Sequence, residues 1–115
     1  MSPTEDELDG HTLRKRYADG AFIRLMIRRT SDAAYPSGWR YALHYGAVAP
    51  DAIDGPTLAD GTIRRYDNAH ERTKGHELHL APDPEPTVVE FPGIEDLYER
   101  FWDAIPKDRF GPLDQ

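Results

Sequence analysis

The chain has 115 residues, the size of one domain that buries a single core. It has no apolar run long enough to span a bilayer, and its first ten residues are acidic where a signal peptide would be basic. Because the chain has no cysteine, disulfides, thiolate nucleophiles and cysteine-based zinc sites are excluded, and we expect a cytoplasmic protein that does not contact membranes.

Acidic residues outnumber basic ones, with 21 Asp and Glu against 14 Lys and Arg, for a formal net charge of −7. Only Lys15, Lys74 and Lys107 are lysines. Such a composition is typical of proteins from salt-loving archaea; the alternative is an ordinary acidic protein from a GC-rich bacterium. In molar salt the Debye length falls to about 3 Å, so phosphate binding there would depend on short arginine contacts.

The first half of the chain has the alternating pattern of strands. Residues 1–10 are predicted to be a disordered acidic leader, and residues 11–115 a single α+β domain. Strands are expected at 13–17 and 22–29, joined by a hairpin turn at Asp19-Gly20. A third strand at 39–45 places four large side chains on one face: Trp39, Tyr41, Leu43 and Tyr45.

In the second half, residues 49–59 form a loop rich in proline, glycine and aspartate. Two strands at 61–67 and 76–80 flank a polar loop at 68–75. A proline-rich connector at 82–86 leads to a short strand at 87–91. A helix follows, ended by Pro106, with its apolar residues at helical spacing: Ile94, Leu97, Tyr98, Phe101 and Ile105. The pattern predicts an α+β fold, an antiparallel β-meander of five or six strands packed through its aromatic face against one C-terminal α-helix.

Residues 64–79 concentrate the titratable groups of the chain, including three of its five histidines. If the 68–75 loop is centred near Arg72, Asp67 pairs with Glu77 and Arg65 with His79, and these four side chains share one face. A one-residue slip would turn every side chain over. Such a face can perform general acid–base chemistry; the alternative is a salt-bridge ladder that faces solvent.

A histidine metal site would use His70, His76 and His79. On a strand, residues three apart point to opposite faces, so His76 and His79 cannot bind one ion without a bulge. The histidine spacing also lacks a matching carboxylate or cysteine ligand. We therefore predict no metal and no cofactor.

Arginines on the first three strands raise the possibility of nucleic-acid binding, with tyrosines at 17, 35 and 66 as stacking surfaces. The alternative is that these arginines point outward and pair with the surplus carboxylates. The set comprises Arg14, Arg16, Arg24, Arg28, Arg29 and Arg40, with His44 beside them.

The run Gly61-Thr62-Ile63-Arg64-Arg65-Tyr66-Asp67-Asn68-Ala69-His70, the following His76 and His79, and the helix opening Ile94-Glu95-Asp96-Leu97 resemble the TumE-like toxin family. Glu77 stands where the family often has a further histidine. The resemblance covers roughly residues 20–105 and implies two sets of site residues. The catalytic candidates are Arg65, Tyr66, Asp67, His70, His76 and His79, and the ligand-binding candidates are Arg64, Asn68, Lys74 and Glu77.

The resemblance implies a toxin of a toxin–antitoxin system, encoded beside a helix-turn-helix antitoxin and acting on RNA. His79 or His76 would be the base for a ribose 2′-OH, and the other histidine or Tyr66 would supply the proton. Arg65 or Arg64 would stabilise the charge on phosphate, without a metal. The competing hypothesis is a non-enzymatic binding module, and a protein carried by a mobile element is compatible with either. The sequence leaves the oligomeric state open.

Overall fold

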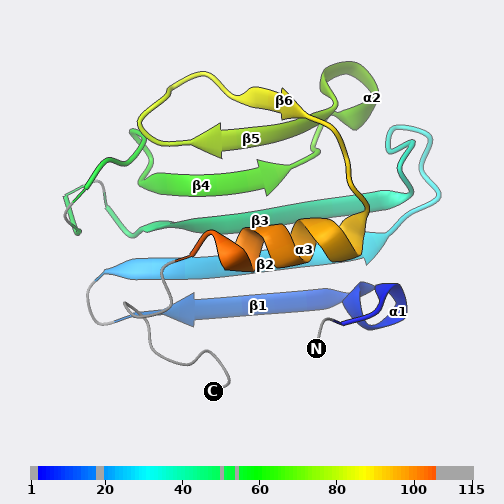
Figure 1. Cartoon of the computed structure of the whole chain (residues 1–115), viewed down its shortest axis with the longest axis horizontal. Coiled ribbons are helices and arrows are strands. Elements are labelled where there is room, and N and C mark those ends of the chain that lie inside the picture. Colours follow the sequence, from blue (N-terminus) through cyan, green and yellow to red (C-terminus); the bar gives the residue numbers. More distant parts are fainter. Residues whose placement is uncertain (1–2, 18–19, 50, 54, 106–115) are drawn as a thin grey trace.

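The sheet is a six-stranded antiparallel meander whose spatial order, β1-β2-β3-β4-β5-β6, follows the chain (Figure 1). The computed structural model describes residues 3–17, 20–49, 51–53 and 55–105. Together with the C-terminal helix, the meander confirms the predicted α+β class. The strands are β1 His11–Arg16, β2 Ala21–Arg29, β3 Trp39–Ala47, β4 Thr62–Asp67, β5 His76–Leu80 and β6 Thr87–Val89.

One long helix, α3 (Ile94–Asp103), lies across β2 and β3 on one face of the sheet (Figure 1). Its apolar stripe of Ile94, Leu97 and Phe101 is fully buried. It packs on the inward side chains of β2 and β3, and this confirms the prediction that the helix covers the aromatic face. The predicted helix end at Pro106 lies outside the described residues.

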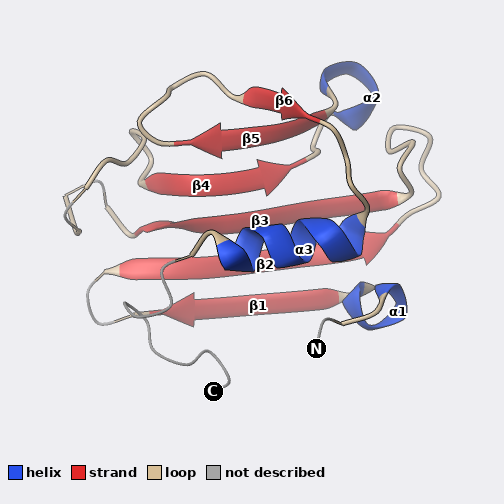
Figure 2. Cartoon of the chain, in the orientation of Figure 1, coloured by secondary structure: helices blue, strands red, loops and turns tan. Residues whose placement is uncertain are grey.

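Two single-turn helices at the same end of the sheet differ from the predicted elements (Figure 2). The first, α1 (Glu5–Leu8), lies within the segment predicted to be a disordered leader. It is ordered by a capping box between Thr4 and Glu7, and Leu8 is only 1% exposed in the core. The second, α2 (Glu71–Lys74), lies within the predicted 68–75 loop. One helical turn is too short to give a helical hydrophobic period.

The face of the sheet opposite α3, which we call the open face, is not covered by any helix in the described part of the chain. Its side chains come from the outward positions of each strand, so they are mostly polar. Cross-strand pairing aligns one residue of each of the first five strands in a line across this face. We call this line the basic row: Arg14, Arg24, His44, Arg65 and His79.

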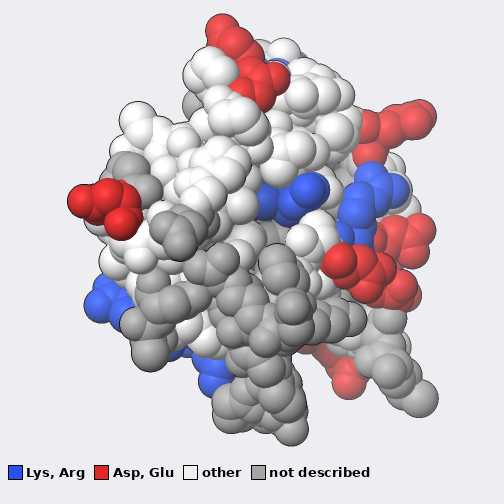
Figure 3. Space-filling view, turned by 60° about the vertical axis from the view of Figure 1, so that its left-hand side comes forward, with Lys and Arg blue, Asp and Glu red and all other residues white. Residues whose placement is uncertain are grey.

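In the described residues, no helix combines the length and the apolar character that crossing a membrane would need. On the surface that Figure 3 shows, basic and acidic side chains are interspersed, and neither sign forms a continuous field.

Candidate functional site

The predicted cluster forms on the open face where β4 pairs with β5. Asp67 is opposite Glu77 and Arg65 is opposite His79, so the predicted register is confirmed. Arg65 Nε donates to Asp67 Oδ2 at 2.9 Å, and His79 Nε2 lies 3.2 Å from the same oxygen. Glu77 Oε1 is 3.6 Å from His79 Nε2, so one imidazole nitrogen faces two carboxylates.

His79 has a partner in both of its protonation states. With a proton on Nε2 it can donate to Asp67 or Glu77. Without that proton, Nε2 can accept from Arg65 Nη2, which is 3.4 Å away. A side chain that must gain and lose a proton during a reaction needs such an environment. The imidazole is mostly buried, with 18% of its side chain exposed.

His44 continues the cluster onto β3, where it is opposite Arg65. Its Nε2 is 2.8 Å from Thr62 Oγ1. Burial of the ring, and then the positive charge of Arg65, lower the pKa of His44 to about 4. The imidazole is therefore neutral at pH 7. A shallow pocket next to it is lined by the outward side chains of β2, β3 and β4, among them Arg24, Met26, Arg40, Ala42, His44 and Arg65.

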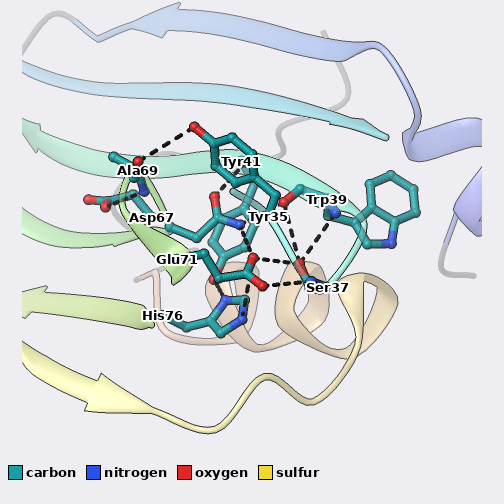
Figure 4. A network of polar contacts seen from close by, with 9 residues as sticks. Tyr35, Ser37, Trp39, Tyr41, Asp67, Ala69, Glu71 and His76 are labelled. Atoms are coloured by element: carbon teal, nitrogen blue, oxygen red, sulfur yellow. Dashed lines mark hydrogen bonds and ion pairs between the residues drawn. The ribbon is translucent and has the colours of Figure 1, made fainter. Parts of the chain in front are cut away.

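Asn68 is fully buried and belongs to a polar network at the end of the sheet. Figure 4 labels its partners in this network, among them Tyr41, Trp39 and Glu71. Asn68 Oδ1 accepts from the Tyr41 backbone N–H at 3.1 Å, and Asn68 Nδ2 donates to Trp39 O at 2.6 Å and to Glu71 Oε1 at 2.7 Å. Glu71 also accepts from the backbone N–H and the hydroxyl of Ser37, at 2.6 and 2.7 Å. The network joins the β2–β3 loop, β3 and α2, and it leaves Asn68 no exposed surface with which to contact a ligand.

His76 belongs to this network and faces α3, not the open face. Its ring stacks on Phe91 at 4.6 Å, and its Nδ1 is 2.6 Å from the Tyr41 hydroxyl. Burial raises the pKa of Tyr41, so the phenol keeps its proton while its hydroxyl is hydrogen-bonded to His76. Burial also lowers the pKa of His76, although Glu71, 3.7 Å from Nε2, opposes this shift. The structure therefore separates His76 from His79 by the thickness of the sheet, as strand parity predicts.

The other predicted site residues are also apart from the open face. Tyr66 is buried in the core, on the side of the sheet that carries α3, and Arg64 donates to its hydroxyl at 3.4 Å from the same side. His70 and Lys74 are exposed at the two ends of α2. Of the predicted set, the structure brings together on the open face Arg65, Asp67, Glu77 and His79.

Three of these residues could also hold a divalent cation. One ligand atom each of Asp67, Glu77 and His79 lies within 4.8 Å of the others, which is a metal-ligating set that the histidine spacing did not reveal. The guanidinium of Arg65 already places a positive charge 2.9 Å from the shared Asp67 oxygen. The expected absence of a metal and of a cofactor stays a prediction.

Sequence reasoning assigned Arg24 and His44 to a general basic patch but not to the acid–base cluster. The alternating pattern of β2 and β3 shows that both side chains point away from the core. Their position beside Arg65, by contrast, depends on pairing between β3 and β4. Arg29, which was placed in the same patch, lies elsewhere. It pairs with Asp6 at 2.7 Å and covers the Trp39 ring at 5.2 Å.

The fold and the cluster define a class: a small α+β protein with one sheet face covered by a helix and the other bearing a histidine–carboxylate–arginine cluster. The model of the family described as Toxin TumE matches residues 2–109, and the chain belongs to this family. Comparison with curated proteins gave no match, and comparison with solved structures gave none either. The protein is therefore a toxin-like protein by its family.

Proposed function

We propose that this protein is the toxin of a toxin–antitoxin system and cleaves RNA at the open face without a metal. The observation that carries the proposal is the environment of His79. Its Nε2 has carboxylate acceptors at 3.2 and 3.6 Å and a guanidinium donor at 3.4 Å. This environment supports a site in which His79 exchanges a proton with a substrate and Arg65, beside it, binds a phosphate.

In the proposed reaction, His79 accepts the proton of a ribose 2′-OH. The 2′-oxygen forms a bond to phosphorus, the bond from phosphorus to the 5′-oxygen breaks, and the leaving oxygen takes a proton from solvent. The products are a 2′,3′-cyclic phosphate and a free 5′-hydroxyl. Arg65 stabilises the negative charge on the phosphate, while Asp67 holds Arg65 and His79 in place.

This mechanism replaces the pairing of His79 with His76 or Tyr66 that the family resemblance implied. His76 and Tyr66 face α3, so neither can reach a phosphate bound on the open face. Arg64 is on that same side and cannot replace Arg65. The residues for which we propose a catalytic role are therefore His79, Arg65 and Asp67, with Glu77 as a second acceptor for the imidazole proton.

The test is to incubate the purified protein with single-stranded RNA, in chelator, at low and at molar salt. We expect cleavage that leaves cyclic phosphate ends, no cleavage of 2′-O-methyl RNA, and a rate at least about 10²-fold lower for His79→Ala. The matched control is His11→Gln, a histidine on the opposite side of the sheet in contact with Tyr98 of α3. Intact RNA with the wild-type protein, or equal rates for the wild type and His79→Ala, would reject the proposal.

We also propose a cognate helix-turn-helix antitoxin as the protein partner, because the family is one of toxins. Co-expression with the product of an adjacent small gene should relieve growth arrest if the arrest comes from this protein.

A non-enzymatic binding module is the competing function. It is favoured by the three-residue edge strand β6, where Val88 is 67% exposed next to an unpaired strand edge.

A further inference from the structure

The basic row extends well beyond the proposed catalytic cluster. His79 and Arg65 form one end of it, His44 is in the middle, and Arg24 and Arg14 continue it to β1. Because neighbouring strands lie about 4.8 Å apart, a line across five strands is about 19 Å long. This is longer than the reaction needs, since one phosphodiester contacts only the β4–β5 end.

Two pairs of opposed arginines on the open face, one inside the basic row and one outside it, oppose folding stability. Arg14 is directly opposite Arg24, and Arg28 is directly opposite Arg40, although the chain has 21 acidic residues available to pair with them. Like charges at opposed positions destabilise a sheet. No ion pair recorded in the described residues includes any of these four arginines. A bound polyanion would remove this repulsion.

The β1–β2 end of the row also offers an aromatic surface. A shallow pocket there is lined by Arg14, Arg16, Phe22, Arg24 and other residues of the two strands. The Arg24 guanidinium lies 5.7 Å from the centre of the half-buried Phe22 ring, whose ring centre is 4.9 Å from that of His44 in an edge contact. A surface that binds a single strand has two parts: arginines that bind the phosphates, and an aromatic ring on which a base stacks.

We propose that the basic row binds the backbone of single-stranded RNA that crosses the strands from β1 to β5, with one phosphodiester delivered to His79. The inference deepens the proposed function and rests on it. Single-stranded RNA is favoured over a duplex, because Phe22 can stack only on a base that is free of its partner. Arg14 and Arg24 are binding residues, distant from the reacting bond.

Binding is measured by fluorescence anisotropy with a labelled single-stranded 2′-O-methyl RNA oligonucleotide, which the proposed reaction cannot cleave. The affinity of each variant is followed over a range of salt concentrations. Each phosphate contact contributes about 0.7 to the slope of log affinity against log salt for a single strand. We therefore expect the slope to become shallower by about 0.7 for Arg24→Ala and by about 1.4 for the Arg14→Ala, Arg24→Ala double variant.

The matched control is Arg100→Ala, which removes the same charge from the exposed side of α3 and should leave the slope unchanged. Equal slopes for Arg24→Ala and Arg100→Ala, or no binding by the wild-type protein, would overturn the inference. An unlabelled duplex of the same sequence should compete more weakly than the single strand, and stronger competition would also overturn it. If the slopes change as expected but unmodified RNA stays intact, the row is supported and the proposed cleavage is rejected. If unmodified RNA is cleaved but the slopes do not change, the proposed cleavage is supported and the role of the basic row in binding is rejected.

Discussion

At the scale of single residues, the histidines of this chain differ because of the faces on which they lie. His79 has an acceptor and a donor within reach, whereas His76 is stacked on Phe91 and hydrogen-bonded to the Tyr41 hydroxyl. His44 lies between the Phe22 ring and the Thr62 hydroxyl, and burial and the charge of Arg65 keep it neutral. The same side chain therefore has three different roles within one sheet.

The lowered pKa of His44 predicts a dependence of stability on pH. His44 of the unfolded chain binds a proton below about pH 6.5, but His44 of the folded chain does so only near pH 4. Burial and the charge of Arg65 oppose the protonated form, and they outweigh Asp60 and Asp67, which favour it. Stability from this residue is unchanged above pH 6.5 and falls as the pH decreases from 6.5 towards 4. Because the ring is partly exposed and screened, we expect a loss on the order of 1 kcal/mol at pH 5.

Urea unfolding of the wild type and of His44→Gln at pH 7, 6 and 5 measures this effect. The glutamine keeps a hydrogen-bonding group near Thr62 but does not titrate, so the variant should lose less stability than the wild type over this range. His70→Gln, at an exposed histidine, is the control and should follow the wild type. Parallel curves for the wild type and His44→Gln would contradict the assignment.

At the scale of elements, the buried network orders the β4–β5 connection. Asp67, the last residue of β4, has its side chain in the open-face cluster, and the next residue, Asn68, is bonded to β3 and to α2. The β2–β3 loop is tied to the same point through Ser37 and through the Arg72 N–H, which donates to Ala34 O. The position of Asp67 therefore depends on groups that never touch the open face.

Asn68→Ala is expected to reduce the free energy of unfolding by at least about 2 kcal/mol, because it leaves the buried Tyr41 N–H without its acceptor and removes the donor to Trp39 O and Glu71 Oε1. Chemical denaturation measures the loss. Lys74→Ala, an exposed residue of the same connection, should change stability by no more than about 0.5 kcal/mol. A stable Asn68→Ala protein that had lost only ligand binding would instead support the ligand-contacting role predicted from the family resemblance.

Much of this element-scale structure follows from sequence patterns alone. Alternation of apolar and polar residues predicts β2, β3, β4 and β5 to within a few residues, because each strand has one face in the core. The single-turn helices α1 and α2 were missed because they are ordered by capping and buried polar bonds, which leave no periodic pattern. The ten-residue length of α3 and its buried stripe, by contrast, make the helix evident from the spacing of its apolar residues.

At the scale of the whole molecule, the net charge of −7 opposes compaction at low salt. The alternating signs visible on the surface in Figure 3 reduce this repulsion only locally. If the composition reflects a salt-loving source, as the scarcity of lysine predicts, the protein should work where long-range attraction to RNA is screened. Binding would then depend on direct arginine contacts such as those of the basic row.

We therefore expect the thermal unfolding midpoint to rise by several degrees as KCl is increased from low to molar concentration, because salt screens the repulsion among the surplus carboxylates. Differential scanning calorimetry measures the midpoint. Sucrose at matched osmolality is the control, because it acts by exclusion from the surface and not by screening. A midpoint that falls with KCl would contradict the expectation.

The sequence by itself determined the α+β class, the order of the strands and the separation of His76 from His79, because these depend on local alternation and on one short hairpin whose register the loop length sets. It also placed Arg65, Asp67, Glu77 and His79 on one face. Only the tertiary structure decided that Asn68 is buried and that His44, Arg24 and Arg14 extend the cluster across the sheet. The place of His44 beside Arg65 depends on pairing between β3 and β4, which a long connection joins. The burial of Asn68 depends on hydrogen bonds to β3 and α2, which no local pattern encodes.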